Sequence, residues 1–186
     1  MLFINEAVRP EAGYNENVEQ QISVKTKIDR AVELFSSLGI YGEILQDYSK
    51  TKLMKLIYLF FIEYIDATRI YNTIPDEFKG YTFYAWEHGP VEKSIYDNIY
   101  VVILRLLRIS APVQEPSWDS YPEGAKENLT KAFNRVKSCY LPMSPQEIVD
   151  FTHEVLDEWK RTPILQKMEF KNGFATECDL ASRYKG

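Results

Sequence analysis

The stretch SKTKLMKLIYLFFIEYIDATRIY, Ser49 to Tyr71, decides the fold because it is apolar around most of its helical circumference. Its apolar residues recur at intervals of three and four, the spacing that places side chains on one face of an α-helix. This stripe consists of Leu53, Leu56, Ile57, Phe60, Tyr64 and Ile65, and it is widened by Phe61 and Ile62. A helix that is apolar on so many sides is normally central to a core. We therefore expect one large core built around this segment.

The start of this helix carries basic residues, which is unusual because lysine opposes the positive end of the helix dipole. Either the helix begins earlier, near Glu43, or Lys52 and Lys55 contact an acidic group. Exposed charges cost little free energy. The simpler expectation is therefore that these lysines lie on a solvated face.

Further segments have the same helical spacing on both sides of this stretch. Residues 24–42 place Ile28 and Phe35 on one stripe, and residues 125–140 do the same with Leu129 and Phe133. These patterns predict a mainly α fold, a compact single domain with at most a short extended segment or β-hairpin near residues 80–86. We expect residues 1–22 to form a flexible arm, residues 23–162 the helical domain and residues 163–186 a C-terminal tail.

The strongest local signal is SPQEIVDFTHEVLDEWKRT, residues 144–162. Ser144 and Glu147 have the spacing of a capping box, in which each side chain satisfies a backbone N–H of the other residue. Pro145 lies between them at the first helical position, where no N–H is needed. The pattern predicts a helix with Thr152 and Trp159 on its buried stripe.

The stretch FYAWEHGPVEKSIYDNIY, Phe83 to Tyr100, combines a short alternating run with Gly89 and Pro90. Alternation predicts an extended segment, with Trp86 filling the core. Proline is favoured at the first position of a helix and a glutamate suits its positive end, so we expect Gly89 and Pro90 to begin a helix. The free N–H groups of such a start could bind an anion, with Lys93 nearby. A purely structural role is the simpler expectation.

Composition excludes several classes of protein. With 22 basic and 27 acidic residues the net charge is -5, so nothing attracts a phosphate backbone at long range and nucleic-acid binding is not expected. No apolar run approaches the roughly 20 residues that a membrane span needs. The N-terminus has no signal-peptide pattern. We expect a soluble, cytoplasmic protein.

Candidate chemistry is sparse. The His/carboxylate neighbours are Glu87 with His88 and His153 with Glu154, and a metal or acid/base site would require these two segments to converge. The two cysteines lack metal-ligand spacing. We therefore expect no catalytic residue, no metal and no cofactor, and a metal-dependent enzyme is the least favoured alternative.

Three pieces of the sequence, read in order, resemble the Panacea antitoxin domain, also described as the SocA-like or GepA-like phage-associated domain. They are TKLMKLIYLFFIEY, FYAWEHGPVEKSIYDNI and PQEIVDFTHEVLDEWKRT, within residues 49–162. The motif positions are Lys55, Leu56, Tyr58, Phe83, Ala85, Trp86, Gly89, Pro90, Val91, Tyr96, Thr152, His153 and Trp159. His88 stands where the family often has an aromatic residue.

The resemblance implies a helical protein without enzymatic activity that neutralises a cognate toxin by direct contact. We expect the partner to contact Tyr84, Glu87, His88, Lys93 and Tyr96, since partly exposed tyrosines are common interface anchors. One alternative is a protease adaptor or phage-associated interaction protein that uses residues 1–22 or 164–186 to hold a partner. The apolar run YVVILRLL, residues 100–107, could also support a homo-oligomer.

Overall fold

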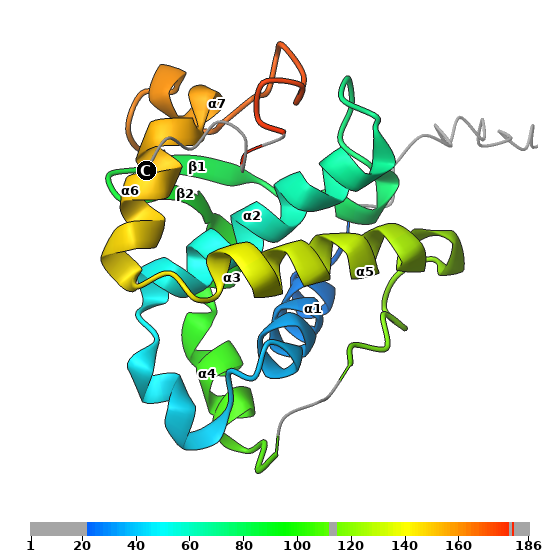
Figure 1. Cartoon of the computed structure of the whole chain (residues 1–186), viewed down its shortest axis with the longest axis vertical. Coiled ribbons are helices and arrows are strands. Elements are labelled where there is room, and N and C mark those ends of the chain that lie inside the picture. The colour runs from blue at the N-terminus through cyan, green and yellow to red at the C-terminus, as the bar shows by residue number, and fades with distance from the viewer. Residues whose placement is uncertain (1–21, 112–114, 179, 181–186) are drawn as a thin grey trace, which may run out of the picture.

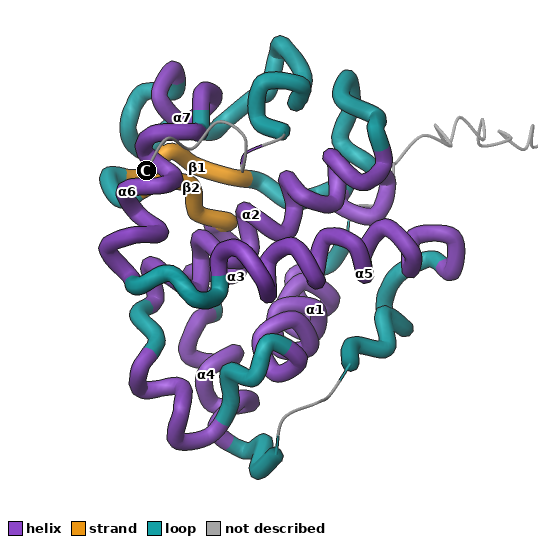
Figure 2. The backbone as a smooth tube through the Cα atoms, in the orientation of Figure 1, coloured by secondary structure: helices purple, strands orange, loops and turns teal. Residues whose placement is uncertain are grey.

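The computed structural model describes residues 22–111, 115–178 and 180, and over these residues the chain is mainly helical with one small antiparallel sheet (Figures 1 and 2). This confirms the predicted fold class. The α-helices are α1 Val24–Ser37, α2 Lys50–Thr68, α3 Lys93–Asp97, α4 Ile99–Leu107, α5 Lys126–Arg135, α6 Pro145–Val155 and α7 Asp157–Arg161. The strands are β1 Phe83–Trp86 and β2 Gly89–Glu92. Three short 3-10 turns, Gly42–Asp47, Asp76–Phe78 and Glu123–Ala125, and a π-helical turn, Val136–Tyr140, complete the pattern.

Helix α2 is the centre of the core, as its sequence predicts. Every side chain from Lys52 to Ile65 is buried, and the helix packs against α5, α6 and β2. Figure 1 shows α2 crossing the middle of the molecule with α5 beside it. A helix buried on all sides has no polar face, which explains why its sequence is apolar on most sides.

The expectation for the first turn of α2 was wrong. The helix begins at Lys50, where the Ser49 hydroxyl accepts the N–H of Lys52, and not near Glu43. The lysines are buried, and among the described contacts neither forms an ion pair with a carboxylate, while Glu147 acts on Lys52 electrostatically. Lys52 donates instead to two backbone carbonyls that follow α5, those of Leu141 at 2.9 Å and Met143 at 2.5 Å.

The other helices follow their predicted stripes. The capping box at the start of α6 is present, with Ser144 and Glu147 bonded reciprocally and Pro145 at the first position. Thr152 is fully buried as predicted, whereas Trp159 is only partly buried because α6 ends at Val155 and Trp159 belongs to α7.

Gly89 and Pro90 do not begin a helix, so that prediction is corrected. They start β2, in which Pro90 pairs with Ala85 and Gly89 with Trp86. Proline is tolerated here because the strand lies at a sheet edge, where its missing N–H is not required. Glu92 then caps α3 by accepting the N–H of Ile95 at 2.8 Å.

Residues 163–178, here called the C-terminal segment, pack along the free edge of β1. Leu165 and Met168 donate backbone N–H groups to the carbonyls of Ala85 and Phe83, at 2.6 and 2.8 Å. Phe174 is buried beside α2. In Figure 1 this segment runs from orange to red. The expected N-terminal arm lies outside the described residues except for Ile22.

No helix in the described part of the chain is both long and apolar enough to cross a lipid bilayer.

Candidate functional site

The best candidate site is a cavity of about 370 Å³ between α2, the β1–β2 turn, α3 and the C-terminal segment, here called the hairpin pocket. Its walls are mostly apolar, as is usual for binding pockets. The lining residues are Thr51, Met54, Lys55, Trp86, Glu87, His88, Gly89, Val91, Tyr96, Ile164 and Leu165. Three stretches distant in sequence, residues 51–55, 86–96 and 164–165, therefore build one site.

Lys55 provides the buried charge of the pocket. Its side chain is only 1% exposed, and its ammonium lies 3.5 Å from the Pro90 carbonyl, the limit of a hydrogen bond. Burial lowers the pKa of Lys55 to about 7. The amine is thus poised between its charged and neutral forms near neutral pH.

Gly89 is the residue that makes room for this lysine. Its φ angle is +105°, which side-chain-bearing residues rarely adopt. A Cβ atom on Gly89 would lie 2.5 Å from Cε and 2.7 Å from Nζ of Lys55. The motif positions Lys55 and Gly89 are therefore coupled by direct contact.

Aromatic residues form one wall of the site and tie it to α7. Trp86 and Tyr96 meet edge to face at 4.6 Å between ring centroids. The indole N–H of Trp159 donates to the Trp86 carbonyl at 2.9 Å. The Trp159 ring stacks on His153, with 4.2 Å between the centroids. These contacts hold the hairpin turn in a fixed position on α6 and α7.

His88 and His153 approach each other closely enough to interact electrostatically. Burial lowers the pKa of His153, and the charge of Lys55 lowers it further, with a smaller effect from His88. A hydrogen bond to the backbone of Glu87 acts in the opposite direction and raises the pKa of His153. Within the described residues no three His, Cys, Asp or Glu side chains are grouped to hold a metal.

The mouth of the pocket combines charged and apolar groups. Glu87 and His88 are exposed at the turn. Beside them the C-terminal segment presents Ile164, 53% exposed, and Leu165, 69% exposed. Leu165 has a φ angle of +69°, a left-handed conformation that is unfavourable for a leucine.

The structure brings several of the residues singled out in the sequence to the pocket. Of the expected partner contacts, Glu87, His88 and Tyr96 line the pocket. Tyr84 and Lys93 do not, because Tyr84 pairs with Lys167 of the C-terminal segment and Lys93 forms an exposed ion pair with Asp97. The motif residues Leu56, Tyr58, Phe83, Ala85, Pro90, Val91 and Thr152 are buried, and of these Val91 lines the pocket.

Sequence reasoning missed several residues that build the site. Lys27 in α1 forms a buried ion pair with Glu92 at 2.7 Å. The burial of Lys27 could have been predicted from the sequence, because Lys27, Ala31 and Leu34 share one helical stripe. The place of Ile164 and Leu165 at the site could not be predicted from periodicity, because it follows from hydrogen bonds of this segment to β1.

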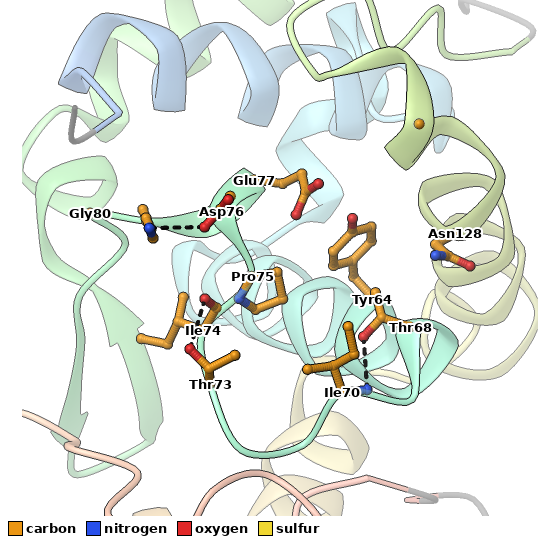
Figure 3. Close-up of a pocket in the computed structure, with 12 residues that line it drawn as sticks. Tyr64, Thr68, Ile70, Thr73, Ile74, Pro75, Asp76, Glu77, Gly80 and Asn128 are labelled. Carbon is orange, nitrogen blue, oxygen red and sulfur yellow. Dashed lines mark hydrogen bonds and ion pairs between the residues drawn. The ribbon is translucent and has the colours of Figure 1, made fainter. Parts of the chain in front are cut away.

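A larger depression of about 790 Å³ lies between the end of α2, residues 70–80 and the start of α5 (Figure 3). Some of its polar groups are engaged by neighbours: Lys79 pairs with Asp76 at 2.9 Å, and the Thr68 hydroxyl accepts the N–H of Ile70 at 3.2 Å. The hairpin pocket is the better candidate because it contains a buried amine without a strong partner.

Comparisons of the chain with models of known protein families, with curated proteins and with solved structures find no match. The case for a function therefore rests on the residues and geometry of the site.

Proposed function

We propose that the chain is a protein-binding module of the Panacea antitoxin type, which neutralises a cognate toxin by direct contact at the hairpin pocket. The observation that carries the proposal is the mouth of the pocket, where exposed Ile164 and Leu165 stand beside an apolar cavity. Apolar side chains exposed next to a cavity, with a polar rim, are typical of protein interaction sites. Glu87 and His88 supply that rim.

The backbone of Leu165 supports the same proposal. A leucine in a left-handed conformation stores strain, and such strain occurs mainly at functional sites. Here the hydrogen bond from Leu165 to Ala85 holds the strained residue at the pocket mouth. A binding role also needs only shape and surface chemistry, so the lack of enzymatic activity remains part of the proposal.

Co-expression tests the proposal. The chain is expressed in bacteria with each immediate genomic neighbour, growth is measured, and complexes are isolated by pull-down. We expect rescue from one toxic neighbour and a stable complex with it. Leu165→Asp should abolish both effects, whereas Leu104→Asp, a matched change at a 58% exposed leucine of α4, should preserve them.

Other outcomes point elsewhere. Loss of binding with Leu104→Asp alone would place the partner on α4 and contradict a site at the hairpin pocket. Shortening of the partner's half-life by the chain would favour the protease-adaptor alternative. That alternative requires the C-terminal segment to leave β1 if residues 164–178 are to hold a partner, because they pack there in this structure. Absence of both rescue and complex would overturn the antitoxin proposal.

A further inference from the structure

Three lysines are almost completely buried in the described part of the chain, and two of them are well paired. Lys27 meets the Glu92 carboxylate at 2.7 Å, and Lys52 donates to two carbonyls at 2.9 and 2.5 Å. Lys55 has, among the described residues, a single hydrogen-bond contact, at 3.5 Å to the Pro90 carbonyl. Buried charges are normally paired, so the Lys55 amine has unused hydrogen-bonding capacity.

Among the described residues, no carboxylate forms an ion pair with Lys55. The neighbouring hydroxyl of Thr152 donates to the Val149 carbonyl at 2.9 Å, and among the contacts described no hydrogen bond joins it to Lys55. The pocket walls near it are Met54, Val91 and the Trp86–Tyr96 pair. Glu87 is the carboxylate that lines the pocket, and it is exposed at the turn, with no ion pair to Lys55 among the contacts described.

The hairpin is shaped to keep this amine at the pocket. Gly89 lines the cavity, and a Cβ atom at this position would lie 2.5 Å from Cε and 2.7 Å from Nζ of Lys55, so the lysine would have to shift to admit it. A buried amine beside an apolar cavity of about 370 Å³ has the features of an anion site with room for an attached apolar group.

We infer that the hairpin pocket binds a carboxylate attached to an apolar group, with the Lys55 ammonium as its counter-ion. The carboxylate accepts hydrogen bonds from Nζ, and the apolar group packs against Trp86, Tyr96 and Met54. Charge-assisted hydrogen bonds are the strong ones, and a carboxylate compensates the desolvation of the ammonium. The inference does not depend on the antitoxin proposal, because the ligand can be a free acid.

Burial lowers the pKa of Lys55, which is consistent with this site because desolvation disfavours a charged ammonium that no carboxylate compensates. A bound carboxylate would raise that pKa. The other titratable groups facing the site are His153 from α6, His88 and Glu87 from the turn, and the Tyr96 phenol from α3. His153 is itself disfavoured in its charged form by burial and by Lys55.

Two sources carry the required chemistry: a short-chain carboxylic acid and the C-terminal carboxylate of a protein. Calorimetric titration of the full chain at about pH 6.5 uses hexanoate against hexanamide, and the peptide Ala-Ala-Leu with a free or an amidated C-terminus. We expect the acid of at least one pair to bind about tenfold or more tightly than its amide, as for a hydrogen bond to a charged group. The pair that shows the preference identifies the source.

Variants locate the effect. Lys55→Met should abolish the preference for the acid, and Lys50→Met, the same change at a partly exposed lysine of α2 outside the pocket, should preserve it. In the unaltered protein, NMR of carbon-13-labelled lysine should show the Lys55 signal titrating at higher pH when the acid is bound. Equal binding of acids and amides, a preference that survives Lys55→Met, or an unchanged Lys55 titration would overturn the inference.

Discussion

The ammonium of Lys27 lies 2.7 Å from the carboxylate of Glu92, and both side chains are buried. Lys27 belongs to α1 and Glu92 ends β2, so the ion pair joins the first helix to the hairpin. The same carboxylate accepts the N–H groups of Thr82 and Ile95 and the hydroxyl of Ser94. One side chain thus fixes the start of α3 and the base of the hairpin that forms the pocket.

Lys27→Met should destabilise the protein by about 3 kcal/mol, because it leaves the Glu92 carboxylate buried without its cation. Lys25→Met in the same helix removes an exposed ion pair with Asp29 and should cost about 0.5 kcal/mol or less. Urea unfolding followed by circular dichroism measures both changes. Similar values for the two variants would show that the buried pair does not hold the hairpin.

Lys55→Met should change the free energy of unfolding in the opposite direction and stabilise the protein. Methionine has a similar length and no charge, so it should fill the same space without the desolvation penalty of an unpaired ammonium. We expect the free energy of unfolding to rise by about 2 kcal/mol at pH 7. Stabilisation by this variant would show that the buried ammonium is not needed for folding and lowers the stability of the fold. Destabilisation by this variant would mean that Lys55 is a structural residue.

The stability gain of Lys55→Met should depend on pH because the pKa of Lys55 is lowered in the folded protein. The ordinary lysine pKa of 10.5 applies in the unfolded chain, and about 7 applies in the folded protein. Between these values the unfolded state binds more protons, so the Lys55 contribution to stability becomes more favourable as pH rises, by up to about 1.4 kcal/mol per pH unit. Below about pH 7 both states are protonated and the full penalty is present.

The advantage of Lys55→Met over the unaltered protein should therefore be largest near pH 6.5 and shrink towards pH 9.5. Urea unfolding of both proteins at several pH values gives this difference, and titrations common to both largely cancel. The His153 contribution is the main exception, since Lys55 acts on its pKa, but its effect lies at the acid end of the range. A difference independent of pH would show that Lys55 keeps its ordinary pKa.

Gly89→Ala should destabilise the fold by about 2 kcal/mol or more, because the φ angle of +105° is strained for alanine and its Cβ would overlap Lys55. Combining it with Lys55→Ala removes the overlap and leaves the backbone strain. The double variant should then be more stable than the sum of the single changes predicts, and a double-mutant cycle measures this coupling. Simple additivity would contradict a direct contact between the two residues.

The helices were predictable because their signals are local. The capping box of Ser144 and Glu147 and the stripe through Leu53 and Phe60 lie within one helix each. The prediction that Gly89 and Pro90 begin a helix was wrong because proline is compatible with both a helix start and an edge strand. Pairing with Ala85 and Trp86 decides between them, and that pairing depends on the tertiary fold.

The site was only partly predictable for the same reason. His88 and Tyr96 were visible as polar or amphipathic residues beside the Gly-Pro turn. The burial of Lys55 was not, because exposure is the common state of a lysine and only the packing of α6 and the hairpin overrides it. Leu165 reaches the pocket through a backbone hydrogen bond to Ala85, for which no side-chain pattern exists.

Leu165→Gly separates stability from binding at the pocket mouth. Glycine adopts a φ angle of +69° without strain, and the side chain it replaces is 69% exposed, so little packing is lost. We expect the free energy of unfolding to rise by about 1 kcal/mol, while affinity for the partner found by co-expression falls roughly tenfold through loss of an apolar contact. Leu104→Gly is the control: it should destabilise α4 by about 1 kcal/mol and leave affinity unchanged. Unaltered affinity in Leu165→Gly would remove the strained leucine from the interface and, with it, the main reason to place the partner at this pocket.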